Sequence, residues 1–405
     1  MLFLSLWHCY CNINLYSFNF LAFFAFINRK LMNYTDSYTC LKDLFDIEKK
    51  DIKIPWSDIS ICNLNYQSKF SESDFFNSED HEIKENIRFT YPVFKPSQES
   101  LSVILLLHGL NERNWSKYLT WAHSLAENTS SYVVLFPISF HINRSPSLWS
   151  NPREMATFMN ERRNETGDNN MLSFANAALS SRLAKEPLRF FNSGYQTATD
   201  LIDLLVEIRD GRHEIIPGGC KLNIFAYSIG AFLGEILMLA NPQNLFSDSK
   251  IFLFCGGSFF SGMNGRSKLI MDNHSFTEVF DFYMKSFENI ITGENKIFKF
   301  IRSSQLGAAF RSMLDKKILK DFRESRLAKI SDQIRGIALE KDTVIPAKSI
   351  TETLNEPGKE DVVNVNDFPF PYSHENPFPI FKTPLAQEVD RNFDLIFSKA
   401  SAFLS

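Results

Sequence analysis

Short apolar runs alternate with longer, helix-patterned stretches along most of the chain. Five runs are apolar almost throughout: 102–107, 132–136, 222–226, 251–255 and 337–339. A sixth run, 362–365, is less apolar. Parallel strands that are covered on both faces of a sheet have this nearly continuous apolar composition. We therefore predict that these runs are buried strands.

The stretches between the runs have apolar residues at helical spacing. They include residues 115–127, 196–209, 229–240 and 385–403. Strand–helix alternation of this kind predicts an α/β fold, a doubly wound and mostly parallel sheet with helices on both faces. Ligands bind such sheets at the carboxyl ends of the strands, so we expect any chemistry there.

Three other segments complete the predicted organisation. Residues 86–94 alternate in polarity and are followed by Lys95-Pro96, which predicts an outer strand. Residues 32–85 are mixed and polar, and we predict a loosely structured lead-in to a domain at 86–405. Two long helical insertions, 141–194 and 259–330, follow the second and the fourth apolar run, and we expect them to cap the strand ends.

Residues 1–31 form a strongly apolar segment with Arg29 and Lys30 directly after its apolar part. The segment lacks the leading positive charge and the small-residue cleavage site of a secretory signal, and its asparagines weaken a membrane span. Three alternatives stay open: a misassigned start with translation from Met32, a membrane anchor, or a signal-like segment. We expect a cytoplasmic protein, with anchoring or export through residues 1–30 as the alternative. Membrane contact is expected only if this segment is real.

Charge and cysteine content narrow the expected partners. The net charge is −4 over 405 residues, and no run of Lys and Arg suggests a nucleic-acid partner. The six cysteines form no C-x-x-C pair and have no zinc spacing with histidine. A small-molecule substrate is therefore the expected partner, and no metal or other cofactor is predicted.

Residues 221–233, K-L-N-I-F-A-Y-S-I-G-A-F-L, carry the strongest chemical signal. An apolar strand runs directly into a helix, with the small residues Ala226 and Gly230 two positions to either side of Ser228. So tight a turn places the serine on a strained elbow, exposed as a nucleophile. The N–H of Ile229 then points to where an oxyanion would form, and the helix dipole favours negative charge there. A serine that only caps the helix is the alternative.

This turn resembles the nucleophile elbow of the α/β-hydrolase superfamily, although Ala226 replaces the usual glycine. The first core strand also ends as in that superfamily, in L-L-L-H-G-L at 105–110. The resemblance covers about residues 86–405 and looks like a bacterial branch. It implies that the N–H of Leu110 completes the oxyanion hole, and that Gly109 lets the chain pass close to the substrate oxygen.

The resemblance also implies an acid and a histidine later in the chain. The sequence I-A-L-E-K-D at 337–342, followed by T-V-I-P, fits the acid-bearing loop, which makes Asp342 the acid and Glu340 the reserve. A turn or a helix cap is the other interpretation of Asp342. Only His374 lies C-terminal to Asp342 among the histidines, on a proline-rich loop before the last predicted helix. The order Ser–Asp–His matches this superfamily.

These residue types fit acyl transfer through serine. A serine hydroxyl needs an adjacent base, an imidazole titrates near neutral pH, and a carboxylate orients the imidazole. The leading prediction is a serine hydrolase that cleaves a carboxylic ester, or a thioester or amide, through an acyl-serine. An acyltransferase and a catalytically silent binding protein on the same fold are the alternatives.

Arginines on the first insertion are candidates for substrate binding. Arg144, Trp149 and Arg153 lie close together in the sequence, and Arg182 and Arg189 follow. An arginine in a cap would hold a carboxylate or phosphate on the substrate. Pairing with structural carboxylates is the alternative, and the one we favour.

Overall fold

The computed structural model describes residues 32–71, 78–167, 169–355, 361–382 and 384–405, which contain one nine-stranded sheet. The strand order is β1-β2-β3-β5-β4-β6-β7-β8-β9. The strands are β1 (Asp51–Lys53), β2 (Ser60–Gln67), β3 (Arg88–Lys95), β4 (Ser102–Leu107), β5 (Tyr132–Leu135), β6 (Lys221–Tyr227), β7 (Ile251–Phe254), β8 (Ile334–Leu339) and β9 (Val363–Asn366). All pairs from β5 to β9 are parallel, whereas β1/β2, β2/β3 and β3/β5 are antiparallel.

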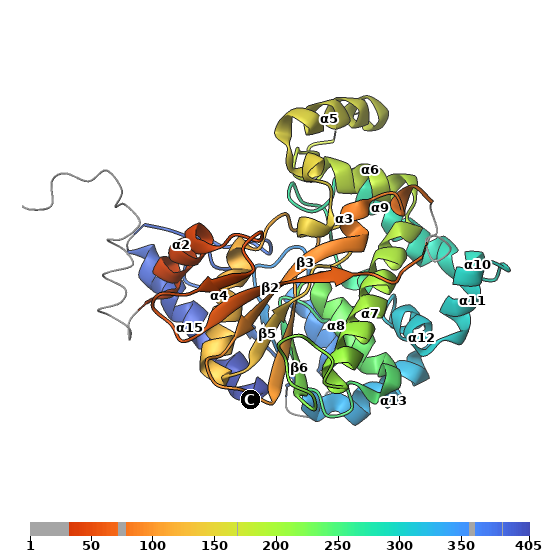
Figure 1. Ribbon diagram of the computed structural model, residues 1–405. Helices are drawn as coiled ribbons and strands as arrows, with labels where there is room; N and C mark the ends of the chain where they lie inside the picture. Colours follow the sequence, from red (N-terminus) through yellow and green to blue (C-terminus); the bar gives the residue numbers. More distant parts are fainter. Residues whose placement is uncertain (1–31, 72–77, 168, 356–360, 383) are drawn as a thin grey trace, which may run out of the picture.

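Helices cover both faces of this sheet (Figure 1). One face carries α2 (Tyr34–Leu44), α4 (Ser116–Thr129) and α15 (Leu385–Leu404). The other carries α7 (Leu188–Arg209), α8 (Ile229–Ala240) and α14 (Ala347–Leu354), and further helices pack outside them. The predicted doubly wound, mostly parallel sheet is therefore confirmed.

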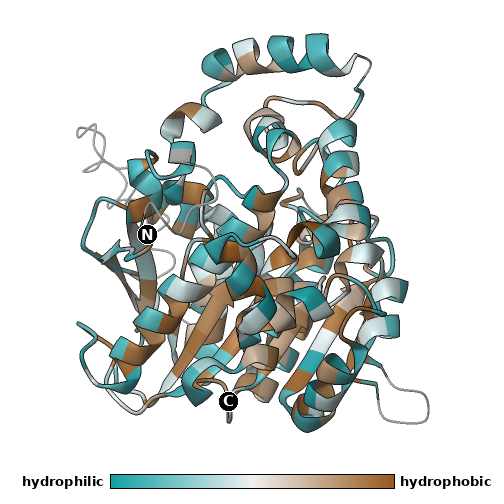
Figure 2. Cartoon of the chain, turned by 90° about the vertical axis from the view of Figure 1, so that its right-hand side faces the viewer, coloured by the Kyte–Doolittle hydropathy of each residue, from teal (hydrophilic) through white to brown (hydrophobic). Residues whose placement is uncertain are grey.

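Strand β4 shows why the predicted strands are apolar almost throughout. Val103, Leu105 and Leu107 belong to the apolar core under α7 and α8. Ile104 and Leu106 belong to the core under α4 and α15. Because successive side chains of a strand point to opposite faces, a strand covered on both sides buries every residue. The apolar colour of the central strands in Figure 2 reflects this double burial.

The predicted lead-in is wrong for most of its length, because it holds α2, β1 and β2. Strand β2 adds to β3, so residues 86–94 are not at the edge of the sheet as predicted. Ile61 and Leu64 of β2 pack into the two opposite cores. Asn63 is buried in a strand position, and its side-chain amide donates to the carbonyls of Asp46 and Lys49 at 3.0 and 2.7 Å. A polar residue used in this way breaks the apolar pattern without breaking the strand.

Helix α2 is fastened to α15 and the loop before it. The backbone N–H and hydroxyl of Thr35 both donate to Asp390 Oδ1, at 2.9 and 2.7 Å. The Tyr34 hydroxyl donates to the Phe378 carbonyl at 2.9 Å, and its ring stacks on Phe393 at 4.3 Å between centroids. Leu41 of the same helix is fully buried. The start of the described chain is thus part of the main core.

The two predicted insertions are helical. Residues 141–194 contain α5 (Pro152–Thr166), α6 (Ala177–Lys185) and the first turns of α7, which continues unbroken past 194. Residues 259–330 contain α9 (Asn273–Asp281), a π-helical turn at Phe282–Ser286, α10 (Phe287–Ile290), α11 (Lys296–Ser303), α12 (Gln305–Ser312) and α13 (Lys320–Ile330). A short α3 (Lys84–Ile87) precedes β3. Helix α6 packs on α9, α12 packs on α8, and α5 stands above the rest of the molecule (Figure 1).

The apolar segment 1–31 lies outside the described residues, so the alternatives for it stay predictions. Within the described ranges, no helix combines the length and apolar character needed to cross a membrane.

Replacing Leu41 by Ala tests whether α2 belongs to the core. Loss of a fully buried leucine side chain removes apolar burial and leaves a cavity, which costs about 2–5 kcal/mol. We expect Leu41→Ala to lower the free energy of unfolding in urea by this amount. Lys42→Ala, an exposed position on the same helix, should change it by less than about 0.5 kcal/mol. Equal effects of the two variants would show that α2 is only loosely attached.

Candidate active site

The strand order creates a crevice between the carboxyl ends of β4 and β6. Strand β5 follows β4 in sequence and lies on one side of it, and β6 lies on the other. Such a reversal is where open α/β sheets bind their ligands. Leu107 of β4 pairs with Ala226 of β6, so the loops that follow these two residues leave the sheet side by side.

Ser228 occupies the turn between β6 and α8 in a strained backbone conformation. Its φ of +57° and ψ of −125° are rare for a residue with a side chain and cost about 1–3 kcal/mol. Its N–H donates to the Phe254 carbonyl at 3.2 Å, and its carbonyl accepts from the Ala231 N–H at 2.9 Å. These neighbours hold the turn in place, with Ser228 only 4% exposed.

Small residues around Ser228 allow this turn. A Cβ on Gly230 would lie 2.6 Å from the Leu107 carbonyl oxygen and 2.7 Å from that of His108. A Cβ on Gly256 would lie 2.4 Å from the Ala231 Cβ and 2.8 Å from the Ser228 carbonyl oxygen. The sequence predicted the need for Gly230 and missed Gly256. The Gly256-Gly257 pair directly after the β7 run was the available signal.

The structure brings Ser228, His374 and Asp342 into one hydrogen-bonded chain. Ser228 Oγ lies 2.6 Å from His374 Nε2, and His374 Nδ1 lies 2.6 Å from Asp342 Oδ2. The other carboxylate oxygen, Oδ1, accepts the N–H groups of Val344 and Ile345 at 2.9 Å each. The carboxylate is thus fixed on both oxygens and faces the imidazole. Both His374 and Asp342 are buried.

Glu340, the reserve acid, is placed differently. It follows β8 directly, its backbone N–H donates to the Asn366 carbonyl at 2.9 Å, and the residue is exposed. The carboxylate that meets His374 is that of Asp342.

Tyr227 anchors the loop that carries His374. Its ring stacks on the imidazole at 5.6 Å between centroids, and its hydroxyl donates to the His374 carbonyl. Lys117 Nζ donates to the Glu375 carbonyl at 2.8 Å. The loop is therefore held from β6 and from α4. The sequence analysis did not identify this role of Tyr227, because a tyrosine at the end of an apolar run is typical of a strand residue.

A buried histidine shapes the loop after β4. The Ile138 N–H donates to His108 Nε2 at 2.8 Å, which makes Nδ1 the protonated nitrogen, and Nδ1 donates to the Gly109 carbonyl at 2.8 Å. Burial lowers the pKa of His108 well below its usual value. The Gly109 N–H donates to the Tyr118 hydroxyl at 3.0 Å. With both polar groups of Gly109 occupied, the next peptide group, that of Leu110, is held in one orientation.

Leu110 and Ile229, whose N–H groups the resemblance assigns to an oxyanion hole, lie near Ser228: Leu110 lines the same cavity as Ser228, and Ile229 follows it directly in the chain. Ile229 is the first residue of α8, so its N–H has no partner within the helix. Leu110 lines two adjoining cavities, and Ile229 lines one of them. We call the first cavity the vestibule: its volume is about 150 Å³, and Ser228 and His374 line it with Asn111, Glu112, Arg113 and Glu375. We call the second the chamber, which is lined by Leu110, Ile229 and aromatic residues.

Both insertions contribute to the roof of the vestibule. Ala175 comes from the first insertion, and Leu269 and Ile270 come from the second. The side-chain amide of Asn111, a residue with φ of +60°, donates to the carbonyls of Ala175 and Leu269 at 2.8 and 2.7 Å. Arg113 Nη2 donates to the Ala175 carbonyl at 3.0 Å. One loop after β4 thus fastens both insertions above Ser228.

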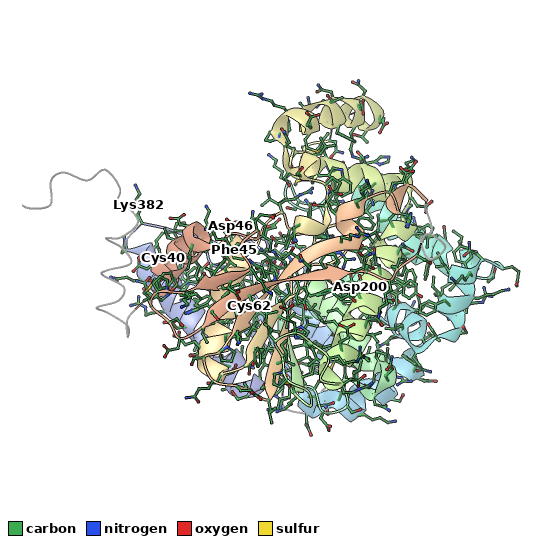
Figure 3. All side chains as sticks on the ribbon, viewed as in Figure 1. Cys40, Phe45, Asp46, Cys62, Asp200 and Lys382 are labelled. Atoms are coloured by element: carbon green, nitrogen blue, oxygen red, sulfur yellow. The ribbon has the colours of Figure 1, made fainter. Side chains whose placement is uncertain are left out.

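The predicted role of Arg144 in substrate binding is wrong, because its guanidinium is fully buried away from the vestibule. Its Nη2 donates to Asp200 Oδ2 at 2.8 Å and to the Asn86 carbonyl at 3.0 Å. Asp200 belongs to α7 and is labelled in Figure 3. The arginine and its carboxylate form an internal ion pair between the first insertion and α7, which is the structural alternative that we favoured.

Trp149 and Arg153 also lie away from Ser228. The Arg182 guanidinium sits over the Trp149 ring at 4.7 Å and pairs with Asp80 at 3.0 Å. Arg153 is exposed at the start of α5. Neither Trp149 nor Arg153 is among the described residues that line the vestibule or the chamber.

Arg113 is the arginine that lines the vestibule. Burial lowers its pKa to about 10, so the guanidinium stays charged at neutral pH. Its Nε has no hydrogen-bond partner among the residues that the structure describes. A short stretch of polar residues after the H-G dipeptide, N-E-R-N at 111–114, was the sequence signal for this lining.

Comparison with solved structures finds distant likenesses. The carboxyl esterase 2 of the fungus Tuber melanosporum is 12% identical, with 87% of this chain and 89% of that chain covered and a TM-score of 0.46. An esterase from Pyrobaculum calidifontis is 11% identical, with 92% of both chains covered and a TM-score of 0.43. An arylesterase is 10% identical, with 95% and 97% covered and a TM-score of 0.44. At these TM-scores and identities, the activity of these proteins is not inferred for this chain.

The mostly parallel sheet, its strand order and the strand–serine–helix turn define an α/β-hydrolase fold. The chain belongs to a family of unknown function, DUF6051, whose model matches residues 70–405. No curated protein matches the chain.

Replacing Gly230 by Ala tests the close approach of α8 to β4. The added methyl group would overlap two backbone carbonyls, which cannot move without displacing β4. We expect Gly230→Ala to lower the thermal unfolding midpoint by several degrees and to abolish any reactivity of Ser228 towards a fluorophosphonate. Gly293→Ala, whose nearest contact would be 3.4 Å from a side chain, serves as the control. Full reactivity of Gly230→Ala would refute the close approach.

Buried histidines beside the site should make stability depend on pH. Burial lowers the pKa of His141 to about 4, and its Nδ1 donates to the Ser139 carbonyl at 2.8 Å. Because the unfolded chain binds this proton near pH 6.5, the stabilisation is present above that pH. It is lost as the pH falls towards 4, at up to about 1.4 kcal/mol per pH unit for each such histidine.

Urea unfolding at a series of pH values between 7 and 4.5 measures this slope. In His141→Asn the amide can replace the Nδ1 donor but does not titrate, so the slope should decrease. His108 should add a slope of the same sign. A free energy of unfolding that stays constant from pH 7 to 5 would contradict the buried, neutral state of these histidines.

Proposed function

We propose that the protein is a serine hydrolase that cleaves a carboxylic ester, or a thioester or amide, through an acyl-serine intermediate. Ser228 is the nucleophile, His374 is the general base, and Asp342 orients the imidazole. The observation that carries the proposal is the hydrogen-bonded chain from Ser228 Oγ through His374 to Asp342, with 2.6 Å at each step. It stands on a strained elbow at the N-terminus of a helix.

The geometry accounts for each step of acyl transfer. His374 Nε2 takes the Ser228 proton while Oγ attacks the substrate carbonyl carbon. Asp342, whose Oδ1 is held by two N–H groups, keeps the imidazole in the tautomer that can accept this proton and stabilises the imidazolium. His374 then returns the proton to the leaving group, and a water molecule repeats the sequence to release the acid.

Two backbone donors support the developing oxyanion. The N–H groups of Leu110 and Ile229 come from the loop after β4 and from the first turn of α8. Donors of this kind contribute about 3 kcal/mol each to transition-state stabilisation. The positive end of the α8 dipole adds to them.

The alternatives predict different outcomes. A silent binding protein has no need for a carboxylate, an imidazole and a hydroxyl in hydrogen-bonding order, so the intact chain of contacts favours an enzyme. An acyltransferase would share the acyl-serine but exclude water from the second step. The polar lining of the vestibule beside His374 favours water as the acceptor.

Substitution of the three residues tests the proposal. Ser228→Ala and His374→Ala should each lower kcat on p-nitrophenyl esters by about 10⁴- to 10⁶-fold. Asp342→Asn should lower it by about 10⁴-fold, because the amide favours the wrong tautomer. Labelling by a fluorophosphonate, read by mass spectrometry of the Ser228 peptide, measures nucleophilicity without a substrate.

Glu340→Gln is the matched control for Asp342→Asn, since both remove a carboxylate after β8. It should keep wild-type turnover and labelling. Near-wild-type turnover by Ser228→Ala on every ester that the wild type hydrolyses would refute the proposal.

A further inference from the structure

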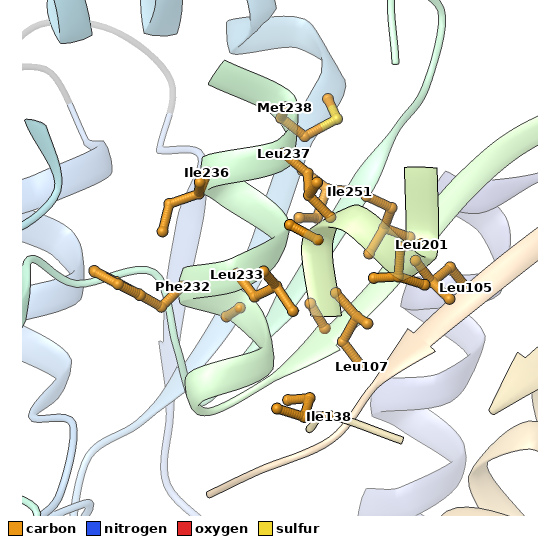
Figure 4. Packing of buried hydrophobic residues seen from close by; sticks show 14 of the residues in the cluster. Leu105, Leu107, Ile138, Leu201, Phe232, Leu233, Ile236, Leu237, Met238 and Ile251 are labelled. Atoms are coloured by element: carbon orange, nitrogen blue, oxygen red, sulfur yellow. The ribbon is translucent and has the colours of Figure 1, made fainter. Parts of the chain in front are cut away.

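The chamber is an apolar cavity directly beside the proposed oxyanion donors. Leu110 and Ile229 are among the residues that line it. Phe232, Leu233 and Ile236 of α8 form one wall, and Figure 4 shows these three side chains with Ile138 near them. Phe190 of α7 and Phe310 of α12 add aromatic surface. Such a lining gains free energy from burying an apolar group and none from holding a charge.

Two polar side chains at the chamber wall donate hydrogen bonds within the protein, whereas His141 Nε2 has no partner among the described residues. The Ser193 hydroxyl donates to the Ser139 carbonyl at 2.9 Å. His141 Nδ1 donates to the same carbonyl, and burial lowers the pKa of this histidine to about 4, so the imidazole is neutral at pH 7. The chamber therefore presents an uncharged surface to an occupant.

The vestibule differs in chemistry and lies on the side of His374. Asn111, Glu112, Arg113 and Glu375 line it, and it meets the chamber at Leu110. The histidine must reach the leaving group, because it returns the proton to that atom. His374 lines the vestibule, Ile229 lines the chamber, and Leu110 lines both. This arrangement favours one direction of the substrate, with the leaving group in the vestibule and the acyl chain in the chamber.

Gly194 gives an independent reason to expect an occupant. It lies inside the long helix α7, where glycine costs helix stability relative to alanine. A Cβ built on it would meet nothing within 4 Å, so packing does not require the glycine. Gly194 lines the chamber. Gly194 therefore weakens its own helix and leaves open space in the chamber. A bound group that fills this space would explain why a glycine stands at this position.

We propose that the substrate is an ester of an apolar acid, with a medium-length alkyl or an aryl acyl group, and of a polar alcohol. This inference rests on the proposed function and specifies its substrate. Ser228 Oγ forms a bond to the acyl carbon, the bond from that carbon to the alcohol oxygen breaks, and the Ser228 proton passes through His374 to the alcohol. Water then cleaves the acyl-serine, which gives the free apolar acid and restores Ser228.

A chain-length series tests the acyl part of the proposal. The values of kcat/KM are measured for p-nitrophenyl acetate, butyrate, hexanoate and octanoate. For the wild type we expect a rise of up to about fourfold per methylene until the chamber is full. Gly194→Leu places a side chain in the open space and should lower the octanoate-to-acetate ratio by about tenfold or more. The octanoate-to-acetate ratio of Gly194→Ala should lie between those of the wild type and Gly194→Leu.

Arg209→Leu is the matched control, because it adds a leucine to an exposed position in the last turn of the same helix. Its chain-length profile should equal that of the wild type. The thermal unfolding midpoint of Gly194→Ala should be equal to or above the wild-type value, which shows that the helix does not need the glycine. An octanoate-to-acetate ratio that is unchanged in both Gly194 variants would overturn the proposal.

Two esters of octanoic acid test the alcohol part. We expect 2-hydroxyethyl octanoate to be cleaved faster than butyl octanoate, because the vestibule provides polar partners for the hydroxyl. Preference for the butyl ester would overturn the assignment of the leaving group to the vestibule.

Binding of octanoate, measured by calorimetry, separates this proposal from the proposed function. Octanoate should bind the wild type at least about tenfold more tightly than Gly194→Leu, and butyrate should bind both weakly. If no ester is cleaved and Ser228 is not labelled, but octanoate binding depends on Gly194, then the hydrolase proposal fails and the chamber assignment stands. If esters are cleaved and octanoate binds neither protein, the chamber assignment fails.

Discussion

The close approach of α8 to the end of β4 is the contact on which the site depends. Gly230 lies against the Leu107 and His108 carbonyls, which leaves Ser228 in a conformation that few residues adopt. The same contact sets the loop after β4, which carries Leu110, beside the first turn of the helix, which begins at Ile229. The strain at the serine and the nearness of these two backbone segments therefore have a single geometric origin.

Buried polar groups around the site mainly hold loops in place. Neutral His108 bridges the loop after β4 to the segment after β5, and Asn111 ties both insertions to that loop. Arg144 and Asp200 join the first insertion to α7. Each bond involves a desolvated group that is costly to leave unpaired, so alternative arrangements of these loops are disfavoured. The loops after β4 and β5 are therefore held firmly beneath the two insertions.

The sequence predicted the central strands, because their apolar runs are local signals. The tight turn at Ser228 is also a local signal, and the order Ser–Asp–His along the chain predicted the three residues that the structure brings together. Strand β2 escaped prediction since Asn63 obtains its partners from a distant turn. The partner of Arg144 escaped prediction for the same reason: the carboxylate that it pairs with, that of Asp200, lies 56 positions away. The chamber was invisible to pattern analysis, because its walls come from several helices that meet only after folding. Whether the three residues catalyse anything stays a prediction.

The fastening of α2 to α15 has a consequence for how the protein is made. The bond from Tyr34 to the Phe378 carbonyl joins residues 344 positions apart. During synthesis from the N-terminus, the apolar side of α2 leaves the ribosome long before its partner helix exists. The nascent chain must carry that surface uncovered through most of translation, which exposes it to aggregation and to chaperones. His374 also emerges late, so most of the chain, including Ser228, is synthesised before the imidazole that bonds to the serine hydroxyl exists.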